Sequence, residues 1–134
     1  MAEDHNTQII QGTYASFGRG DIQAVLNVLT DDIDWRLFGP PEIPYAGHFR
    51  NKDQVQEFFT ALGGTVDFLQ FEPREFIAKG DTVIVFGFEQ GRVRATQRTF
   101  EAHWVHVFVM RDNKIAEFKE YTDTAAMVTA FRPA

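Results

Sequence analysis

His106 and Glu120 are the two residues whose types and spacing best suit proton transfer. They lie in the segment TFEAHWVHVFVMRDNKIAEFKEYTD, residues 99–123, which predicts two strands joined by a tight turn. Because strand side chains alternate between faces, Glu120 shares a face with Phe118, and His106 shares one with three large apolar side chains, Trp104, Phe108 and Met110. An imidazole and a carboxylate in aromatic surroundings can donate, accept or relay a proton.

The same pair also fits two ordinary structural roles. His106 can be a buried polar residue satisfied by its neighbours, and Glu120 can face outward if a bulge shifts the strand register. In a functional pair, His106 would donate to a developing oxyanion, relay a proton or hold the acid in place, since the pKa of an unperturbed imidazole is about 6.5. Glu89, which has the same strand parity as Val85 and Gly87, is a candidate second acid.

Aromatic side chains are unusually numerous, with 14 Phe, 3 Tyr and 2 Trp. This exceeds what close packing of a small domain requires, and it predicts an aromatic-lined cavity, a large subunit interface, or both. Trp35 and Trp104 fit either the walls of a cavity or an ordinary core. Tyr14 and Tyr45 are possible phenolic donors to a ligand.

Length and composition restrict the class of protein. A chain of 134 residues fits one domain spanning 1–134, and the absence of cysteine excludes disulfides and thiolate chemistry and suits the cytoplasm. The net charge of -6 would repel nucleic acid and anionic lipid alike. The polar start MAEDHNTQ and the lack of an apolar run of about 20 residues predict neither a signal peptide nor a membrane anchor.

No metal or other cofactor is predicted from the motifs. His103 and His106 lack a third ligand at a suitable spacing, and the carboxylates are spread over separate elements. The glycines form no phosphate-binding pattern of the G-x-x-x-x-G-K or G-x-G-x-x-G type. His103 has the opposite strand parity to His106, so we expect it to face outward, toward a partner subunit.

The periodicity of the chain predicts helices first and a sheet afterwards. Helices are expected over 6–17, 22–29, from 51 or 53 to a stop at Gly63 and Gly64, and 124–131, with a short strand at 33–38. The loop GPPEIPYAGHFRN is expected to exclude regular structure because of its prolines and glycines. Four strands follow, at about 67–77, 82–90, 98–110 and 114–122. This order predicts an α+β fold with a curved antiparallel sheet wrapped around three N-terminal helices and a short C-terminal helix.

The element order and two segments, FGRGDIQAVLNVLTDDIDW and HVFVMRDNKIAEFKEYTDTA, resemble the SnoaL-like branch of the NTF2-like superfamily. The resemblance spans nearly the whole chain. It implies a cone that encloses an apolar pocket, pairing of two copies through the outer face of the sheet, and a loop around Tyr45 and His48 near the pocket mouth. The superfamily includes ketosteroid isomerases, polyketide cyclases, limonene epoxide hydrolase and members that only bind, so a shared fold leaves the chemistry open.

The isomerase pattern is incomplete in this sequence. The position of the general base of ketosteroid isomerases corresponds to Leu37, which cannot take a proton. Their oxyanion-hole acid corresponds to His106. Their donor tyrosine falls near Thr13, so we expect Tyr14, one residue away, to point elsewhere.

The epoxide hydrolase pattern lacks one residue in this sequence, whereas both residues of the SnoaL-type cyclase pattern have a counterpart. The carboxylate, arginine and carboxylate of epoxide hydrolases correspond to Glu89, Gly87 and Glu120, so the arginine is missing. The histidine and acid of SnoaL-type cyclases correspond to His106 and Glu120, with glutamate in place of the usual aspartate. This last pattern is the best match.

The resemblance and the residues together imply a cofactor-independent acid/base enzyme of isomerase, cyclase or hydrolase type. It would act on a small hydrophobic carbonyl or cyclic substrate through His106 and Glu120. The cavity would be shaped by Tyr14, Trp35, Tyr45, Glu89, Trp104, Phe108 and Phe118. Two alternatives stay open: a non-catalytic module that binds a small molecule, and a structural dimeric protein with a filled core.

Overall fold

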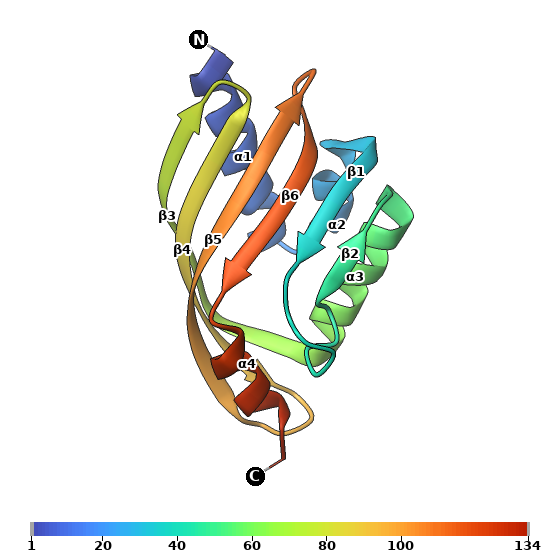
Figure 1. Ribbon diagram of the computed structural model, residues 1–134, viewed down its shortest axis with the longest axis vertical. Coiled ribbons are helices and arrows are strands. Elements are labelled where there is room, and N and C mark those ends of the chain that lie inside the picture. The colour runs from blue at the N-terminus through green and yellow to red at the C-terminus, as the bar shows by residue number, and fades with distance from the viewer. Residues whose placement is uncertain (1, 134) are drawn as a thin grey trace.

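The computed structural model describes residues 2–133, which form four helices and one six-stranded sheet (Figure 1). The helices are α1 (Ala2–Gly18), α2 (Ile22–Asn27), α3 (Lys52–Thr65) and α4 (Thr124–Phe131). The strands are β1 (Leu29–Leu37), β2 (Gly47–Phe49), β3 (Val66–Lys79), β4 (Thr82–Val93), β5 (Thr99–Arg111) and β6 (Lys114–Thr122). The predicted α+β class is therefore confirmed. None of the described helices is both long and apolar enough to cross a membrane.

The sheet has the strand order β2-β1-β6-β5-β4-β3 and is mixed rather than wholly antiparallel. Strands β3 to β6 form the predicted antiparallel meander, and β2 is antiparallel to β1. β1, however, runs parallel to β6, with Trp35 opposite Phe118 and Leu37 opposite Glu120. One helix, α3, and four strands, β2 to β5, separate β1 from β6 along the chain. Such a long connection permits a parallel pair that a tight hairpin does not.

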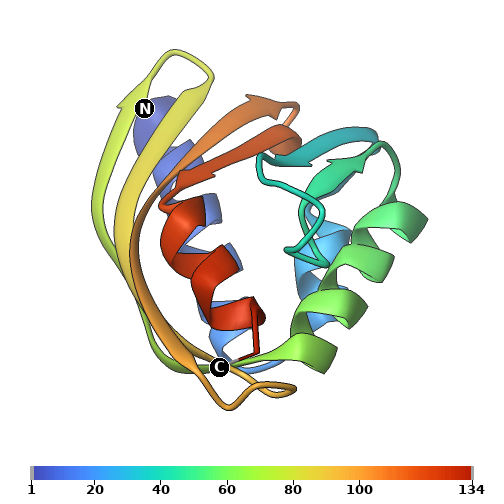
Figure 2. The ribbon, with the colours of Figure 1, turned by 60° about the horizontal axis from the view of Figure 1, so that its bottom comes forward.

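The sheet curves strongly, and the helices lie on its concave side. In Figure 2 the strands form an arc, with α1 and α4 inside it and α3 along its open side, next to α2. Register shifts break the ladder within the β3–β4, β5–β6 and β1–β6 pairs, and such bulges bend and twist a sheet. One of them lies at Pro73 on the edge strand β3, where a residue without an amide proton is tolerated.

Two glycines of β4 make room for rings of β5. A Cβ at Gly87 would lie 2.2 Å from the ring of Trp104, and a Cβ at Gly91 would lie 2.6 Å from the ring of Phe100. Each ring lies flat over the neighbouring strand because that strand has no side chain there. Gly91 is therefore an interior residue of β4, which runs to Val93 and not only to residue 90 as predicted.

Strand parity is confirmed along the meander. On β5, Phe100 and every second residue after it up to Met110 are buried, while Thr99, Glu101 and His103 are exposed. The turn between β5 and β6 is formed by Asp112 and Asn113, both with positive φ, as in a two-residue hairpin turn. Parity therefore puts His106 on the concave face and His103 on the convex face.

Several predicted boundaries are wrong in the first half of the chain. α1 begins at Ala2 rather than at residue 6. α2 ends at Asn27 and β1 begins at Leu29, because the backbone of the segment 28–29 already pairs with Ile115 of β6. The loop predicted to lack regular structure contains β2, whose three residues follow the last proline and pair along the edge of β1.

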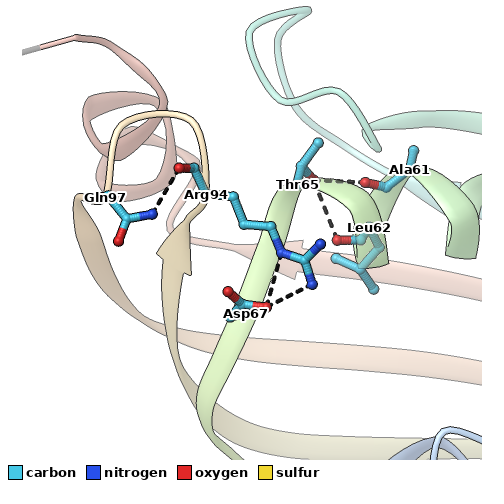
Figure 3. Close-up of polar contacts among 6 residues, drawn as sticks. All are labelled: Ala61, Leu62, Thr65, Asp67, Arg94 and Gln97. Atoms are coloured by element: carbon cyan, nitrogen blue, oxygen red, sulfur yellow. Dashed lines mark hydrogen bonds and ion pairs between the residues drawn. The ribbon is translucent and has the colours of Figure 1, made fainter.

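α3 also does not stop at Gly63 and Gly64 but continues to Thr65. The Thr65 hydroxyl donates to the backbone carbonyl of Ala61 at 2.7 Å, and the chain then enters β3 without a loop (Figure 3). Asp67 of β3 pairs with Arg94 at 2.8 Å, which ties this junction to the hairpin after β4. These contacts stabilise the helix end that the glycines were expected to terminate.

Candidate functional site

A cavity lies between the concave face of the sheet and the helices. The unoccupied space within it is about 620 Å³ including the part open to solvent, and about 70 Å³ can hold the centres of water molecules. Its wall is almost entirely apolar and aromatic, with polar groups from Thr13, Tyr14, Tyr45, Glu89, His106 and Glu120. Such a cavity has the character of a site for a small, hydrophobic ligand that carries few polar groups.

His106 and Glu120 are opposite each other on β5 and β6, and both are buried. The Nε2 atom of His106 lies 2.8 Å from Oε1 of Glu120, a hydrogen bond between side chains that are 6% and 10% exposed. The predicted juxtaposition of the two groups on one face is therefore present. The outward orientation considered for Glu120 is absent, because the bulge in this strand pair falls between Val109 and Met110, beyond His106.

Tyr14 of α1 completes a chain of hydrogen bonds. Its hydroxyl lies 2.7 Å from Nδ1 of His106, and its ring stacks on the imidazole with a 5.9 Å centroid separation and an 11° interplanar angle. The prediction that Tyr14 would point elsewhere is wrong. The helical spacing of Ile10, Tyr14 and Phe17 was the signal that could have corrected it, because residues four and three apart share one face of a helix.

The three groups can be joined by hydrogen bonds that all run in one direction. In that scheme the Tyr14 hydroxyl donates to Nδ1 of His106, and Nε2 donates to the Glu120 carboxylate. Burial and the charge of Glu120 raise the pKa of Tyr14 well above its usual value, which keeps the phenol protonated as this scheme requires. Both ring nitrogens of His106 are thus engaged with protein groups.

Glu89 of β4 is a second buried carboxyl on the cavity wall, only 4% exposed. Among residues 2–133 no side chain or backbone group makes a hydrogen bond to it, whereas Glu120 has His106 as a donor. Burial first, and the charge of Glu120 second, raise the pKa of Glu89 well above its usual value. The two acids therefore differ in surroundings: Glu120 has His106 as a hydrogen-bond partner, and burial favours the neutral form of Glu89.

Tyr45, from the loop between β1 and β2, and Trp35 of β1 each add a buried polar group to the lining residues, and within residues 2–133 the indole Nε1 of Trp35 has no hydrogen-bond partner. Tyr45 is the more deeply buried of the two. It is 2% exposed, and its hydroxyl has no hydrogen-bond partner within the described part of the chain. Its ring packs edge-on against Phe58 of α3 and Phe131 of α4. The loop around Tyr45 is therefore a fixed part of the cavity wall here.

The aromatic wall agrees with the sequence analysis except at Trp104. Trp35 stacks on Phe118 at 4.0 Å, and both line the cavity together with Phe108. Trp104 is not in the wall. It lies over Gly87 and stacks on His106 at 3.9 Å, so it supports the imidazole from behind.

Several lining residues were not anticipated as site residues. They come from the helices and from β3: Thr13, Phe17, Val25, Phe58, Phe59, Leu62, Phe68, Phe71 and Met127. The apolar stripes of the helices indicated burial, but a stripe does not reveal which part of it borders empty space. Leu37, at the position of the isomerase base, also lines the cavity, so no carboxylate occupies that place.

Other titratable residues lie away from the cavity. His48 of β2 bonds Asp34 of β1 at 2.5 Å and Arg36 at 3.1 Å, with half-exposed side chains. His103 is exposed on the convex face, as expected. Within residues 2–133 there is no group of three or more His, Asp or Glu side chains that could hold a metal ion.

Comparison with known proteins shows which family and which solved structures this chain resembles. A sequence model of the SnoaL-like domain matches residues 10–118. An NTF2-like protein from Burkholderia xenovorans LB400 is 36% identical, with 98% of this chain and 99% of that chain covered and a TM-score of 0.90. A second, from Burkholderia thailandensis E264, is 31% identical, with 96% and 98% covered and a TM-score of 0.87. These similarities confirm the predicted NTF2-like cone.

A third similar structure carries information about a ligand. TerC, co-crystallised with polyporic acid, is 27% identical, with 95% of this chain and 98% of that chain covered and a TM-score of 0.84. No curated protein matches the chain.

Proposed function

Because this chain belongs to the SnoaL-like domain family, we propose that it is a cofactor-independent enzyme that moves a proton on a small hydrophobic carbonyl compound. The observation that carries the proposal is the hydrogen-bond chain from Tyr14 through His106 to Glu120 inside an aromatic cavity. A buried chain of this kind costs free energy unless every member is paired. It holds one carboxylate in a fixed position with an oxygen still free.

Glu120 is the proposed base. One of its oxygens accepts from His106, and no hydrogen bond from residues 2–133 reaches the other, which is left for the ligand. In the proposed step this oxygen takes a proton from a carbon next to the carbonyl. The electrons of the broken C–H bond form a C=C bond, and the C=O bond becomes C–O⁻. Return of the proton to the same carbon restores the C=O bond and gives exchange. Where the substrate also has a C=C bond one carbon further on, the proton can return to the far end of the conjugated system, which shifts the C=C bond, restores C=O and completes an isomerisation with no other reactant.

His106 is proposed as a positioning residue. Of the three roles considered from the sequence, holding the acid fits the contacts best. Donating to an oxyanion does not fit, because Nδ1 and Nε2 are already bonded to Tyr14 and Glu120. The stack of Trp104 on the imidazole fixes the plane of the ring. In this dry, aromatic environment each hydrogen bond is stronger than it would be in water.

The relatives support a ligand of hydrophobic character. TerC, which is 27% identical and covered almost completely, was crystallised with polyporic acid. The dominance of aromatic side chains in the present cavity suits a flat, ring-containing molecule.

The proposal is tested by proton exchange. Small cyclic ketones, with 1-indanone as the first, are incubated with the protein in D₂O, and loss of the α-proton signal is followed by NMR. We expect exchange above the buffer rate, and a decrease of at least about 100-fold in Glu120→Gln, because a positioned acid or base typically contributes 10²- to 10⁴-fold. His106→Ala should lose exchange as well.

The matched control is Asp34→Asn, which alters the other histidine–carboxylate pair, and it should leave exchange unchanged. Exchange that persists in Glu120→Gln would refute the catalytic role. Binding of the ketones without exchange in the unaltered protein would favour the second candidate function, a module that only binds a small molecule. That candidate is favoured by the apolar character of the cavity.

A further inference from the structure

The burial of the lining residues shows where the cavity opens to solvent. Those from β1, β4, β5, β6, α2 and α4 are all buried, and so is Tyr45 of the loop between β1 and β2. The lining residues that keep part of their surface in solvent come from α1, α3 and β3, and they are Tyr14, Phe17, Phe59, Phe68 and Phe71. Because only residues that are not fully enclosed can border an opening, the entrance to the cavity lies between α1, α3 and β3.

Phe17, in the last turn of α1, is the centre of a group of phenylalanine rings at this opening. Its ring centroid lies 6.0 Å from that of Phe59 on α3, and 6.1 Å and 5.2 Å from those of Phe68 and Phe71 on β3. Aromatic rings at such separations are in contact. Phe17 therefore bridges the space between α3 and the edge strand β3. We call these four rings the entrance cluster.

A bulge in β3 brings two of the four rings to this place. Phe68 is opposite Gly91 and Phe71 is opposite Glu89, two positions of β4 that share a face, although three residues along β3 would normally put the two rings on opposite faces. The register shift that follows Phe68 accounts for this, and Leu69, within the shift, is 46% exposed. Bulges often aim side chains in this way beside functional sites. The two rings lie 5.3 Å apart and form one side of the entrance.

The opposite side of the cavity is held by polar contacts between buried segments. Glu42, in the loop between β1 and β2, pairs with Arg132 at 3.1 Å, and Tyr45 of the same loop is 2% exposed. The Thr96 hydroxyl donates to the backbone carbonyl of Ala130 at 2.6 Å, which ties α4 to the hairpin after β4. A ligand entering here would have to break these contacts, whereas at the entrance cluster it would displace only ring contacts.

We infer that ligands reach the cavity through the entrance cluster, with Phe17 as the ring that moves, and that this entrance selects flat ring compounds over thick ones. The backbone of Phe17 is fixed, because its carbonyl accepts from the amide of Gly20 at 2.9 Å and Gly20 has a φ of +74°. Its side chain is partly exposed, and such side chains change rotamer within nanoseconds. The inference requires a ligand for the cavity but no proton transfer, so it goes beyond the proposed function.

The dimensions of an aromatic ring explain the selection by shape. When the Phe17 ring turns outward, the slot that it leaves between its neighbours is about as thick as one ring, about 3.5 Å, the contact distance between carbon atoms. A planar aromatic or conjugated molecule can pass through such a slot edge-on and stay in contact with rings on both sides. A saturated cage compound is too thick unless a second ring also moves.

The entrance is tested by the rates at which a ligand enters and leaves. Stopped-flow quenching of tryptophan fluorescence by 1-indanone gives both rates, because Trp35 lines the cavity. Phe17→Ala should raise the association and dissociation rates together, each by at least about 5-fold, with a change in Kd below about 2-fold, because an entrance residue controls the barrier to binding. Phe59→Leu, a milder change at the same opening, should raise both rates as well.

Three control variants separate the entrance from the wall and from other routes. Phe108→Leu alters the buried wall, and it should raise the dissociation rate and Kd without changing the association rate. Glu42→Gln loosens the contact on the opposite side, and Phe38→Leu alters an exposed ring outside the cavity. Both should leave the two rates unchanged.

The selection by shape is tested with camphor, a saturated cage ketone close to 1-indanone in size. In the unaltered protein camphor should associate at least about 10-fold more slowly than 1-indanone, and the difference should shrink in Phe17→Ala. Quenching of tryptophan fluorescence by acrylamide requires no binding and gives a second measure of access. It should increase in Phe17→Ala.

Unchanged rates and unchanged acrylamide quenching in Phe17→Ala and Phe59→Leu would overturn the inference. Faster binding in Glu42→Gln alone would also overturn it, because the entrance would then lie at the loop between β1 and β2. Equal association rates of camphor and 1-indanone in the unaltered protein would refute the selection by shape.

These outcomes are separate from failure of the proposed function. Faster entry in Phe17→Ala without any proton exchange would keep the entrance and refute the enzyme. Loss of exchange in Glu120→Gln with unchanged binding rates in Phe17→Ala would keep the base and refute the entrance.

Discussion

The concave and convex faces of the same sheet each carry a histidine–carboxylate pair, and the two pairs have different surroundings. His106 and Glu120 are 6% and 10% exposed and lie in an aromatic cavity. His48 and Asp34 are 24% and 42% exposed and lie beside Arg36 at the edge of the sheet. The distances, 2.8 Å and 2.5 Å, do not separate them. Burial separates them, because water screens the charges of the exposed pair.

The two faces also differ in how they shift the pKa of a single glutamate. Glu89, on the concave face, has a raised pKa because burial disfavours its charge. Glu72, on the convex face of β3, has a lowered pKa because Gln70 and then Arg74 donate to it. The two residues are near each other in the β3–β4 pairing, where Glu72 is opposite Phe88, the neighbour of Glu89. The direction of each pKa shift therefore depends on the face of the sheet that the carboxyl occupies and not on its place along the strands.

The largest contrast is expected from removing one histidine of each pair. His106→Ala should lower the free energy of unfolding by about 3–5 kcal/mol, because it leaves Glu120 and Tyr14 buried without partners. His48→Ala should cost less than about 1 kcal/mol, because its pair is half exposed. Urea unfolding of both variants measures the difference. Equal losses would show that burial does not distinguish the pairs.

A matched pair of glycine substitutions sharpens the contrast between interior and surface. Gly87→Ala should destabilise by about 1–3 kcal/mol, because the new Cβ would fall 2.2 Å from the Trp104 ring and force it to move. Gly63→Ala, at an exposed position of α3 with nothing within 4 Å, should stabilise by about 0.5–1 kcal/mol. Thermal unfolding of the two variants gives the signs, and a stabilising Gly87→Ala would contradict the close contact.

The two acids should give opposite pH dependences. Because the folded-state pKa of Glu89 is raised, its contribution to stability is complete below about pH 4.5 and is lost as the pH rises through the folded-state pKa. Glu89→Gln should remove a slope of up to about 1.4 kcal/mol per pH unit above that point.

Glu72 serves as the control with the other sign. Since its pKa is lowered, its contribution is present above its unfolded-state pKa and is lost as the pH falls through the folded-state value. Glu72→Gln should therefore alter only the acid side of the stability profile. Unfolding in urea at a series of pH values tests both variants. A difference between Glu89→Gln and the unaltered protein that does not change with pH would refute the raised pKa of Glu89.

A substitution on the convex face is expected to change the stability of the monomer least but to prevent the pairing of two copies of the chain. Phe86, Val105 and Tyr121 are neighbours across β4, β5 and β6, and the first and last are 39% and 48% exposed. The homodimer expected from the sequence stays a prediction, and we propose this row as its contact. Phe86→Glu should convert a dimer to a monomer in sedimentation with little change in monomer stability. A monomeric unaltered protein would refute the proposal.

The fold was largely predictable because its signals are local. Alternation along β5, the tight turn between β5 and β6 and the C-terminal helix at 124–131 were all predicted from neighbouring residues, and the structure confirms them. The errors lie where distant segments compete with local preference. β2 forms after a run of prolines because β1 offers an edge, and α3 passes through two glycines because Thr65 and β3 hold its end.

The residues of the site also fall into those that local sequence could predict and those that depend on distant contacts. The sequence by itself determined that His106 and Glu120 share one face, because strand alternation and a tight hairpin fix their register. It could not place Tyr14, which is 92 residues from its partner His106, nor the unpaired hydroxyl of Tyr45. Those positions were decided by the tertiary structure, since the curvature of the sheet and the seating of α1 and the β1–β2 loop determine which side chains meet in the cavity.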